Sequence, residues 1–148
     1  MPLRRASRHS VGSPRLDYLL HCSGCHGATG VGVPQNGIPR LKGEVAKLLW
    51  VPEGRAYLIQ VPGVGNAGLS DHDTARLLDW LPRALDPEHL PPELAAFTAD
   101  EVRRFRASRQ GDVLARRALI EERLAARGIV LRSYARADVA LSGAIPSP

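Results

Sequence analysis

The stretch Cys22-Ser23-Gly24-Cys25-His26 constrains this chain more than any other part of it. It contains both cysteines of the sequence, and a histidine directly follows the second one. At this spacing two thiols can form thioethers to the vinyl groups of one haem, and the histidine then lies under the ring and ligates the iron. The motif predicts a single covalently attached haem c, with Cys22 and Cys25 as attachment residues and His26 as the metal ligand.

Other uses of a Cys-x-x-Cys pair stay open at this point. A redox dithiol of the thioredoxin kind belongs between a strand and a helix, whereas this pair follows a helix-like run and leads into a glycine-rich loop. A zinc site usually has four ligands, and the sequence contains no second Cys-x-x-Cys or His-x-x-x-His pattern. A disulfide between such close cysteines would restrain little of the chain.

Apolar residues recur at helical spacing before the motif and again near the middle of the chain. Leu16, Leu19 and Leu20 predict a helix that starts near Pro14 and runs into the motif. Leu77, Trp80 and Leu81 predict a later helix, with Ser70 as its N-cap and Pro82 at its end. Glycine- and proline-rich segments at 27–37 and 61–69 predict loops, and 55–60 predicts a short helix. Little of the chain is typical of strands, so we expect an all-α fold.

The C-terminal half has its own helix signals. Thr98 and Glu101 form a capping-box pattern at the start of one helix, and a second helix is expected to run to about Arg127 with Gly128 as its C-cap. The predicted organisation is a disordered N-terminal arm (1–12), a haem domain (13–85), a Pro-rich linker (86–97), a C-terminal helical extension (98–128) and a tail (129–148).

Residues 14–85 together resemble the class I cytochromes c. The features shared with that family are the Cys-x-x-Cys-His motif after an N-terminal helix, an aromatic residue one turn before it, a Pro-x-Leu-x-Gly run, a Leu-Ser-Asp helix start, and an aromatic residue in the last helix: Tyr18, Pro39–Gly43, Leu69–Asp71 and Trp80. The resemblance implies a cytochrome c-like fold in which the first and last helices cross and the two aromatic residues pack near the crossing.

The resemblance also assigns site residues around the cofactor. It implies that the backbone carbonyl of Pro39 accepts a hydrogen bond from the imidazole of His26, which fixes the ligand tautomer, and that Leu41 packs on the haem. The expected cofactor-binding residues are therefore Cys22, Cys25, His26, Pro39 and Leu41.

The sequence departs from the family at the sixth position of the iron. The family normally supplies a methionine from the loop before the last helix, but Met1 is the only methionine of this chain and the loop 61–69 contains no sulfur. Three alternatives follow: an open or weakly ligated iron, ligation by His72 in the first turn of the helix, or a site bordered by Asn66. A His/Met cytochrome with its raised potential is not expected.

Composition limits the partners of the chain. The net charge is +5, and Lys42 and Lys47 are the only lysines, so arginine carries almost all of the positive charge. This balance can attract an acidic partner. The sequence contains no basic stripe with interleaved aromatic residues, so nucleic-acid binding is not predicted. No apolar run is long enough for a membrane span. Haem c attachment predicts a periplasmic or otherwise extracytoplasmic location, although residues 1–13 lack the apolar region of a signal peptide.

Taken together, these features predict a small extracytoplasmic mono-haem c-type cytochrome that exchanges electrons with a redox partner protein such as a dehydrogenase. On this hypothesis the chain is not an enzyme, because the cofactor carries the chemistry. The missing methionine supports an alternative, namely a haem c protein with open coordination that binds a small diatomic ligand or acts on peroxide. The C-terminal helices would either dock a larger partner or pack back on the haem domain.

Overall fold

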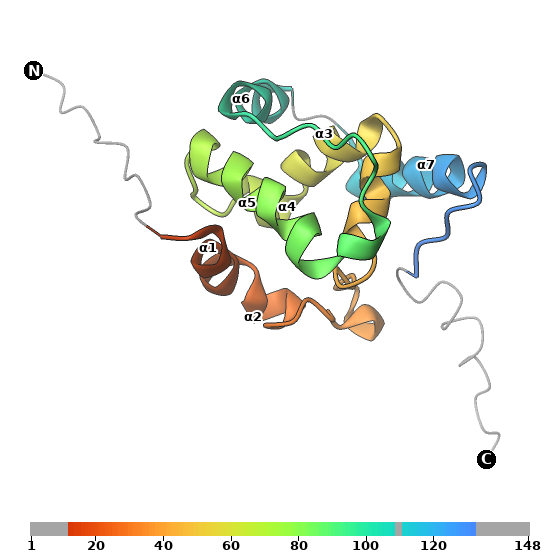
Figure 1. Cartoon of the computed structure of the whole chain (residues 1–148), viewed down its shortest axis with the longest axis horizontal. Coiled ribbons are helices and arrows are strands. Elements are labelled where there is room, and N and C mark those ends of the chain that lie inside the picture. The colour runs from red at the N-terminus through yellow and green to blue at the C-terminus, as the bar shows by residue number, and fades with distance from the viewer. Residues whose placement is uncertain (1–11, 109–110, 133–148) are drawn as a thin grey trace, which may run out of the picture.

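A computed structural model of the chain describes residues 12–108 and 111–132. Within these residues the chain is helical, and its one β-type feature is an isolated antiparallel bridge between Val33 and Ile38. The predicted all-α, cytochrome c-like fold is therefore confirmed (Figure 1). The α-helices and 3-10 helices (η) of the described part are α1 (Pro14–His21), α2 (Ser23–His26), η1 (Pro34–Asn36), η2 (Val45–Trp50), α3 (Glu53–Gln60), α4 (Pro62–Gly65), α5 (Asp71–Leu85), η3 (Pro87–His89), α6 (Ala99–Ala107) and α7 (Val113–Ala125).

Side-chain caps fix where the longer helices begin. Pro14 is the first residue of α1, where its missing N–H removes no helical bond. The Ser70 hydroxyl accepts a hydrogen bond from the Asp73 amide at 3.0 Å and begins α5. The Thr98 hydroxyl accepts from the Glu101 amide at 3.2 Å and begins α6. The two N-caps predicted from the sequence are therefore confirmed.

Pro82 does not end α5, and that prediction was wrong. The helix continues to Leu85, and Pro82 is buried within its last turns. Proline cannot donate a bond to the carbonyl four residues earlier, which normally weakens a helix. Here Pro82 lies beside the buried Leu78 and Leu81, and its own carbonyl accepts from the Asp86 amide at 2.9 Å. The burial of this apolar face offsets the missing bond.

The segment 61–69 is only partly the loop that its glycines and proline predicted. It contains one short helical turn, α4, closed by bonds from the Gly65 amide to the Val61 carbonyl and from the Asn66 amide to the Pro62 carbonyl, both 2.9 Å long. Pro62 is the first residue of this turn and so loses no bond. The turn brings Val61 and Val64 against the hydrophobic core.

Helices α1 and α5 pack against each other and hold the N-terminal motif to the rest of the molecule. The ring centroids of Tyr18 on α1 and Trp80 on α5 lie 5.8 Å apart with the planes tilted by 48°. This tilted arrangement is favourable for aromatic pairs. Tyr18 is almost completely buried, and its hydroxyl donates to the Gly27 carbonyl at 2.7 Å. One side chain therefore connects α1, α5 and the loop after the motif.

The C-terminal helices bury their apolar faces on this body. Helix α6 packs on α5 and α3, and α7 packs on α3 and η2 (Figure 1). Val102, Ile120 and Leu124 are at most 1% exposed, so both helices contribute to the core. Of the two roles considered for these helices, the structure shows that they pack back on the chain.

The division into haem domain, linker and extension stays a prediction. The segment predicted as a linker contains the buried residues Asp86 and Phe97, and the Asp86 carboxylate accepts a bond from the Ala46 amide at 2.9 Å. Most of the predicted arm and tail, residues 1–11 and 133–148, lies outside the described residues. Across the described ranges, no helix is both long enough and apolar enough to cross a bilayer.

Arg55 on α3 connects α6 to the body. Its guanidinium forms two bonds with the Glu101 carboxylate, from Nε to Oε1 and from Nη2 to Oε2, each 2.7 Å long. It also donates to the Ala95 carbonyl and lies 3.9 Å from the centroid of the Phe97 ring. Such a two-point pair fixes orientation as well as position. The bond from Arg55 keeps the pKa of Glu101 below its usual value.

We predict that Glu101→Gln destabilises the protein by about 1.5–3 kcal/mol, the range for hydrogen bonds to charged groups. The lowered pKa means that the folded protein binds fewer protons than the unfolded chain at mildly acidic pH. The contribution of the pair is therefore complete above the unfolded pKa of glutamate and is lost as the pH falls through the folded pKa. Urea unfolding from pH 7 to pH 3 should show a shallower acid loss for Glu101→Gln; the exposed Asp100→Asn serves as the control, and equal slopes for both variants would contradict the prediction.

Candidate cofactor site

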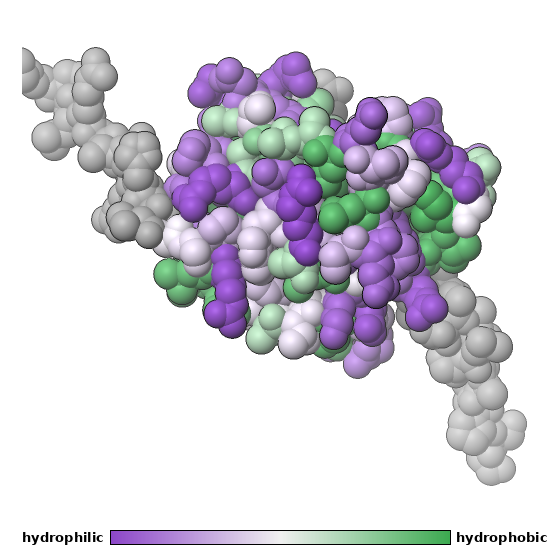
Figure 2. Space-filling model, viewed as in Figure 1, coloured by the Kyte–Doolittle hydropathy of each residue, from purple (hydrophilic) through white to green (hydrophobic). Residues whose placement is uncertain are grey.

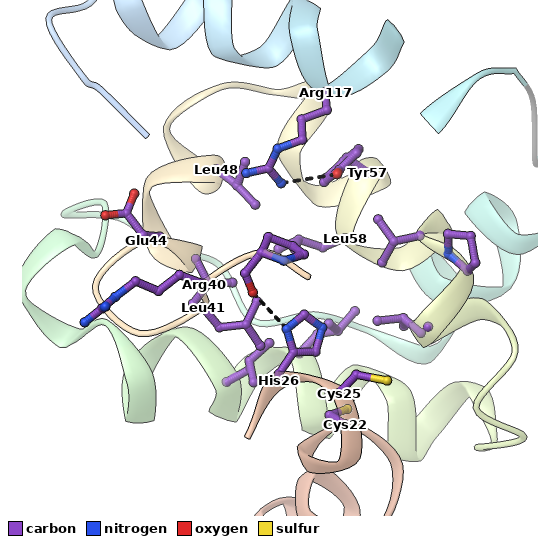
Figure 3. Close-up of a pocket in the computed structure, with 18 of the residues that line it drawn as sticks. Cys22, Cys25, His26, Arg40, Leu41, Glu44, Leu48, Tyr57, Leu58 and Arg117 are labelled. Atoms are coloured by element: carbon purple, nitrogen blue, oxygen red, sulfur yellow. Dashed lines mark hydrogen bonds between the residues drawn. The ribbon is translucent and has the colours of Figure 1, made fainter. Parts of the chain in front are cut away.

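A cavity of about 260 Å³ lies between the N-terminal motif, the 38–48 segment, α3, α4, α5 and α7. A single water molecule needs only about 10–15 Å³ of such space, so the cavity is large enough for an organic cofactor. Cys22, Cys25 and His26 lie at one end of it (Figure 3). Most of the remaining lining is apolar, including Leu41, Val45, Leu48, Leu58, Val61, Val64, Leu78 and Leu81. This lining suits a large, mainly apolar ring such as haem.

One cysteine directly precedes the short helix α2, and the other lies within it. Cys22 is the residue before α2, and its carbonyl accepts from the amides of Cys25 and His26 at 3.2 and 2.9 Å. This single turn brings Cys22, Cys25 and His26 to the same cavity. Cys22 is half-buried and Cys25 is exposed, and both have free thiols. A group held by both sulfurs would have one edge at the protein surface.

His26 is oriented by a backbone carbonyl. Its Nδ1 lies 3.0 Å from the Pro39 oxygen, across thirteen residues of sequence (Figure 3). A neutral imidazole that donates from Nδ1 presents a lone pair on Nε2, the form in which histidine binds metals. Burial lowers the pKa of His26, and the bond to Pro39 acts in the opposite direction. Burial therefore favours the neutral form that a metal ligand needs.

The position of the Pro39 carbonyl depends on a glycine. Gly32 has a φ of +64°, and a Cβ built on it would lie 2.5 Å from the Pro39 oxygen. No side chain fits in that gap. The Gly32 amide also donates to the His26 carbonyl at 2.8 Å. Gly32 is therefore bonded to the His26 backbone and lies directly against the Pro39 carbonyl.

Neither residue considered for the sixth position of the iron borders the cavity. His72 is exposed and lies 3.6 Å from a carboxylate oxygen of Asp73, and Asn66 is exposed in the turn after α4. The histidines of the lining are His26 and the exposed His21 next to the motif. The α4 segment instead contributes Val61, Pro62, Gly63 and Val64 to the cavity wall.

The far end of the cavity holds polar residues that sequence reasoning missed. Tyr57 and Arg117 are both buried, and the Arg117 Nη1 donates to the Tyr57 hydroxyl at 3.3 Å (Figure 3). The buried carboxylate of Glu44 also borders the cavity. A signal for Arg117 was available in the sequence, because it follows Val113 by four residues and precedes Ile120 by three. An arginine in an apolar helical stripe indicates a buried cation with a partner.

The two alternative uses of the cysteines fit the geometry less well. A redox-active thiol normally has a lowered pKa. Burial, reinforced by the nearby Asp17 and Cys25, instead raises the pKa of the Cys22 thiol to about 11. Within residues 12–108 and 111–132, no group of three or more His, Cys, Asp or Glu side chains could hold a metal ion. This part of the chain offers no ligand set for a zinc site.

The thiols of the reduced, cofactor-free chain should differ in reactivity. Because the thiolate is the nucleophile, we predict that iodoacetamide modifies the exposed Cys25 first at pH 8, and that Cys22 modification keeps rising towards pH 11. Peptide mass spectrometry after timed quenching measures both rates. The difference should disappear in 8 M urea, the internal control. Equal rates in the folded chain would contradict the described environment of Cys22.

Comparisons with known proteins agree with the fold and with haem c as the cofactor. The chain is 32% identical over 106 residues to cytochrome c-552 of Thermus thermophilus, in a match that covers 60% of this chain and 80% of the relative. A second cytochrome c-552, from a named strain of the same organism, matches at the same identity, with 71% of that protein covered. No family model matches the chain. A relative of this identity and coverage, together with the helical fold, places the chain in the class I c-type cytochromes, a family of electron-transfer proteins with covalently attached haem c that are not enzymes.

Proposed function

We propose that this chain is a mono-haem electron carrier in which Cys22 and Cys25 form the thioethers and His26 ligates the iron. The observation that carries the proposal is the convergence of both sulfurs and the carbonyl-oriented His26 on one apolar cavity. A haem bound there would supply a one-electron couple, and the protein would supply ligation and burial. Pro39 acts through His26, and Leu41 contributes apolar lining.

The sixth position of the iron is proposed to lack a protein side chain from the described residues. The wall contributed by α4 is made of valine, proline and glycine, none of which has a side-chain lone pair for iron. Methionine is absent from the chain beyond Met1, and His72 and Asn66 are on the surface. The iron would therefore be five-coordinate or hold an exchangeable ligand.

Electron transfer is preferred over ligand chemistry as the function of this site. Family membership supports it directly. Peroxide cleavage needs a proton shuttle close to the bound oxygen, and the α4 wall offers no titratable side chain.

The partner is proposed to be an extracytoplasmic redox protein that docks at the motif edge. Cys25 is exposed there, and α1 next to it exposes Leu16, Leu19 and Leu20. Figure 2 shows hydrophobic residues over α1 at the lower left with hydrophilic residues beside them, and further hydrophobic patches towards the centre and right of the same face. An apolar centre with a polar rim is typical of protein–protein interfaces. The surplus of arginine would favour an acidic partner.

Expression behind a secretory leader, in cells able to attach haem c, tests the cofactor assignment. We expect covalent haem in the unaltered chain and its loss in the Cys22→Ser/Cys25→Ser variant, measured by haem staining after denaturing electrophoresis. Gly24→Ala is the matched control, because this residue lies between the cysteines and a Cβ there meets nothing within 4 Å. Absence of covalent haem from the unaltered chain would overturn the proposal.

Carbon monoxide tests the sixth position in the same preparation. We expect the absorbance spectrum of the reduced protein to change on mixing with CO, because no side chain has to leave the iron. An unchanged spectrum would mean that a strong protein ligand occupies the position, and the open-site proposal would fail while the electron-carrier assignment stayed intact.

Gly32→Ala tests how Pro39 acts on the ligand. A Cβ at Gly32 displaces the Pro39 carbonyl, and loss of its bond makes His26 a less basic ligand. A weaker donor stabilises the ferric iron less, so the reduction potential should rise. Gly43→Ala is the control, because Gly43 has a similar φ of +72° with nothing within 4 Å of a Cβ. Both variants should lose about 1–2 kcal/mol from backbone strain. An equal shift of potential in both would contradict the role of Pro39.

A further inference from the structure

We propose that Arg117 and Tyr57 form the binding site for a haem propionate, so that the C-terminal helix α7 completes the cofactor cavity. The inference rests on the proposed attachment of haem at Cys22 and Cys25. It assigns a cofactor-binding role to a helix that lies outside the region of family resemblance.

The two residues form one polar group within an otherwise apolar region. Arg117 is 6% exposed and Tyr57 is 4% exposed, and both line the cavity. The Arg117 guanidinium donates from Nη1 to the Tyr57 hydroxyl at 3.3 Å and from Nε to Glu121 at 3.0 Å. A guanidinium carries five N–H donors in a planar fork and can therefore bond several partners at once.

The location of this pair matches the chemistry of the haem ring. A haem carries its two vinyl groups on one half of the ring and its two propionates on the other half. Figure 3 shows Cys22 and Cys25 at one end of the cavity, with Arg117 and Tyr57 at the other end, beyond His26. Attachment of the vinyl half to the sulfurs would direct the propionate half away from them, towards Arg117.

The charge of the site favours an anion. Taking a guanidinium out of water is unfavourable unless an anion compensates it, and Arg–carboxylate pairs are among the strongest hydrogen-bonded contacts. The carboxylate of Glu44 also lines the cavity, but its Oε1 accepts from Lys47 at 3.2 Å and its Oε2 accepts from the Arg132 amide at 2.7 Å. Glu44 is therefore already bonded at both oxygens. Arg117 pairs through Nε with Glu121, whose side chain is 39% exposed, and its guanidinium also borders the cavity, where a propionate would add a second carboxylate contact.

Packing fixes Arg117 in this place. It lies in the same helical stripe as Ile120 and Leu124, which are at most 1% exposed and anchor α7 on α3 and η2. Val113, one turn earlier in the stripe, also lines the cavity. The apolar contacts of α7 therefore hold the guanidinium at a set depth, as a preorganised binding group needs.

The test compares Arg117→Met with Arg116→Met in the holoprotein. Both changes remove one positive charge from α7, but Arg116 is not part of the cavity lining. Haem content by the pyridine haemochromogen assay and helix content by circular dichroism establish that each variant is loaded and folded. Resonance Raman spectra then report the propionate bending band, which responds to hydrogen bonds at the carboxylate.

For Arg117→Met we expect a shifted propionate band and a lower reduction potential. A nearby cation stabilises the reduced haem, so its removal should lower the equilibrium constant for reduction about tenfold, which is about 59 mV for a one-electron couple. Arg116→Met should leave the band in place and change the equilibrium constant less than twofold. Arg117→Lys should restore most of the potential but not the band, because an ammonium lacks the planar fork. Tyr57→Phe should move the band with less effect on the potential.

The outcomes separate this inference from the proposed function. If the unaltered protein lacks covalent haem, the proposed function fails first. If it carries haem but Arg117→Met leaves the propionate band unmoved, only the propionate site is overturned. A change confined to the CO-bound spectrum would place Arg117 above the iron instead and would also overturn the proposal.

Discussion

The hydrogen bond between His26 and the Pro39 carbonyl depends on a loop that is held together by its own backbone. The Gly30 carbonyl accepts from the amides of Leu41 and Lys42 at 2.8 and 2.9 Å, while Gly32 bonds to His26 and closely approaches Pro39. Both ends of the loop are thereby joined next to the imidazole. Because main-chain groups make these contacts, few side chains of the loop have to be specified, and glycine at the close approach is the strictest requirement.

Local signals in the sequence were sufficient for much of this arrangement. The spacing of Cys22, Cys25 and His26 indicated the cofactor, and the caps at Ser70 and Thr98 located two helix starts, because these features depend on neighbours within a few residues. The prediction that Pro82 ends α5 was wrong because it also used only local sequence signals. Whether the helix continues through Pro82 depends on the burial of this residue against the core, and local helix propensity carries no information on that burial.

The cavity was harder to predict, because its walls come from distant parts of the chain. The Arg117–Tyr57 bond spans sixty residues, and no local pattern pairs them. The α4 wall was missed because a proline and two glycines resemble an open loop, although Pro62 suits a first helical position. The sequence did show that a loop methionine was missing, whereas only the fold shows that His72 and Asn66 are exposed and lie outside the cavity lining.

Closure by α7 also limits how a partner can use the C-terminal helices. The face that carries Ile120 and Leu124 is buried against α3 and η2, and α6 is held through Arg55 and Glu101. Detaching either helix to bind a partner would expose core residues, at a cost of about 1.5–3 kcal/mol for each large apolar side chain. Contact through the outward face, where Leu114 is 67% exposed, requires no such opening. Any docking by this region is therefore expected to use the outer surface of α7 while its inner face keeps the cavity closed.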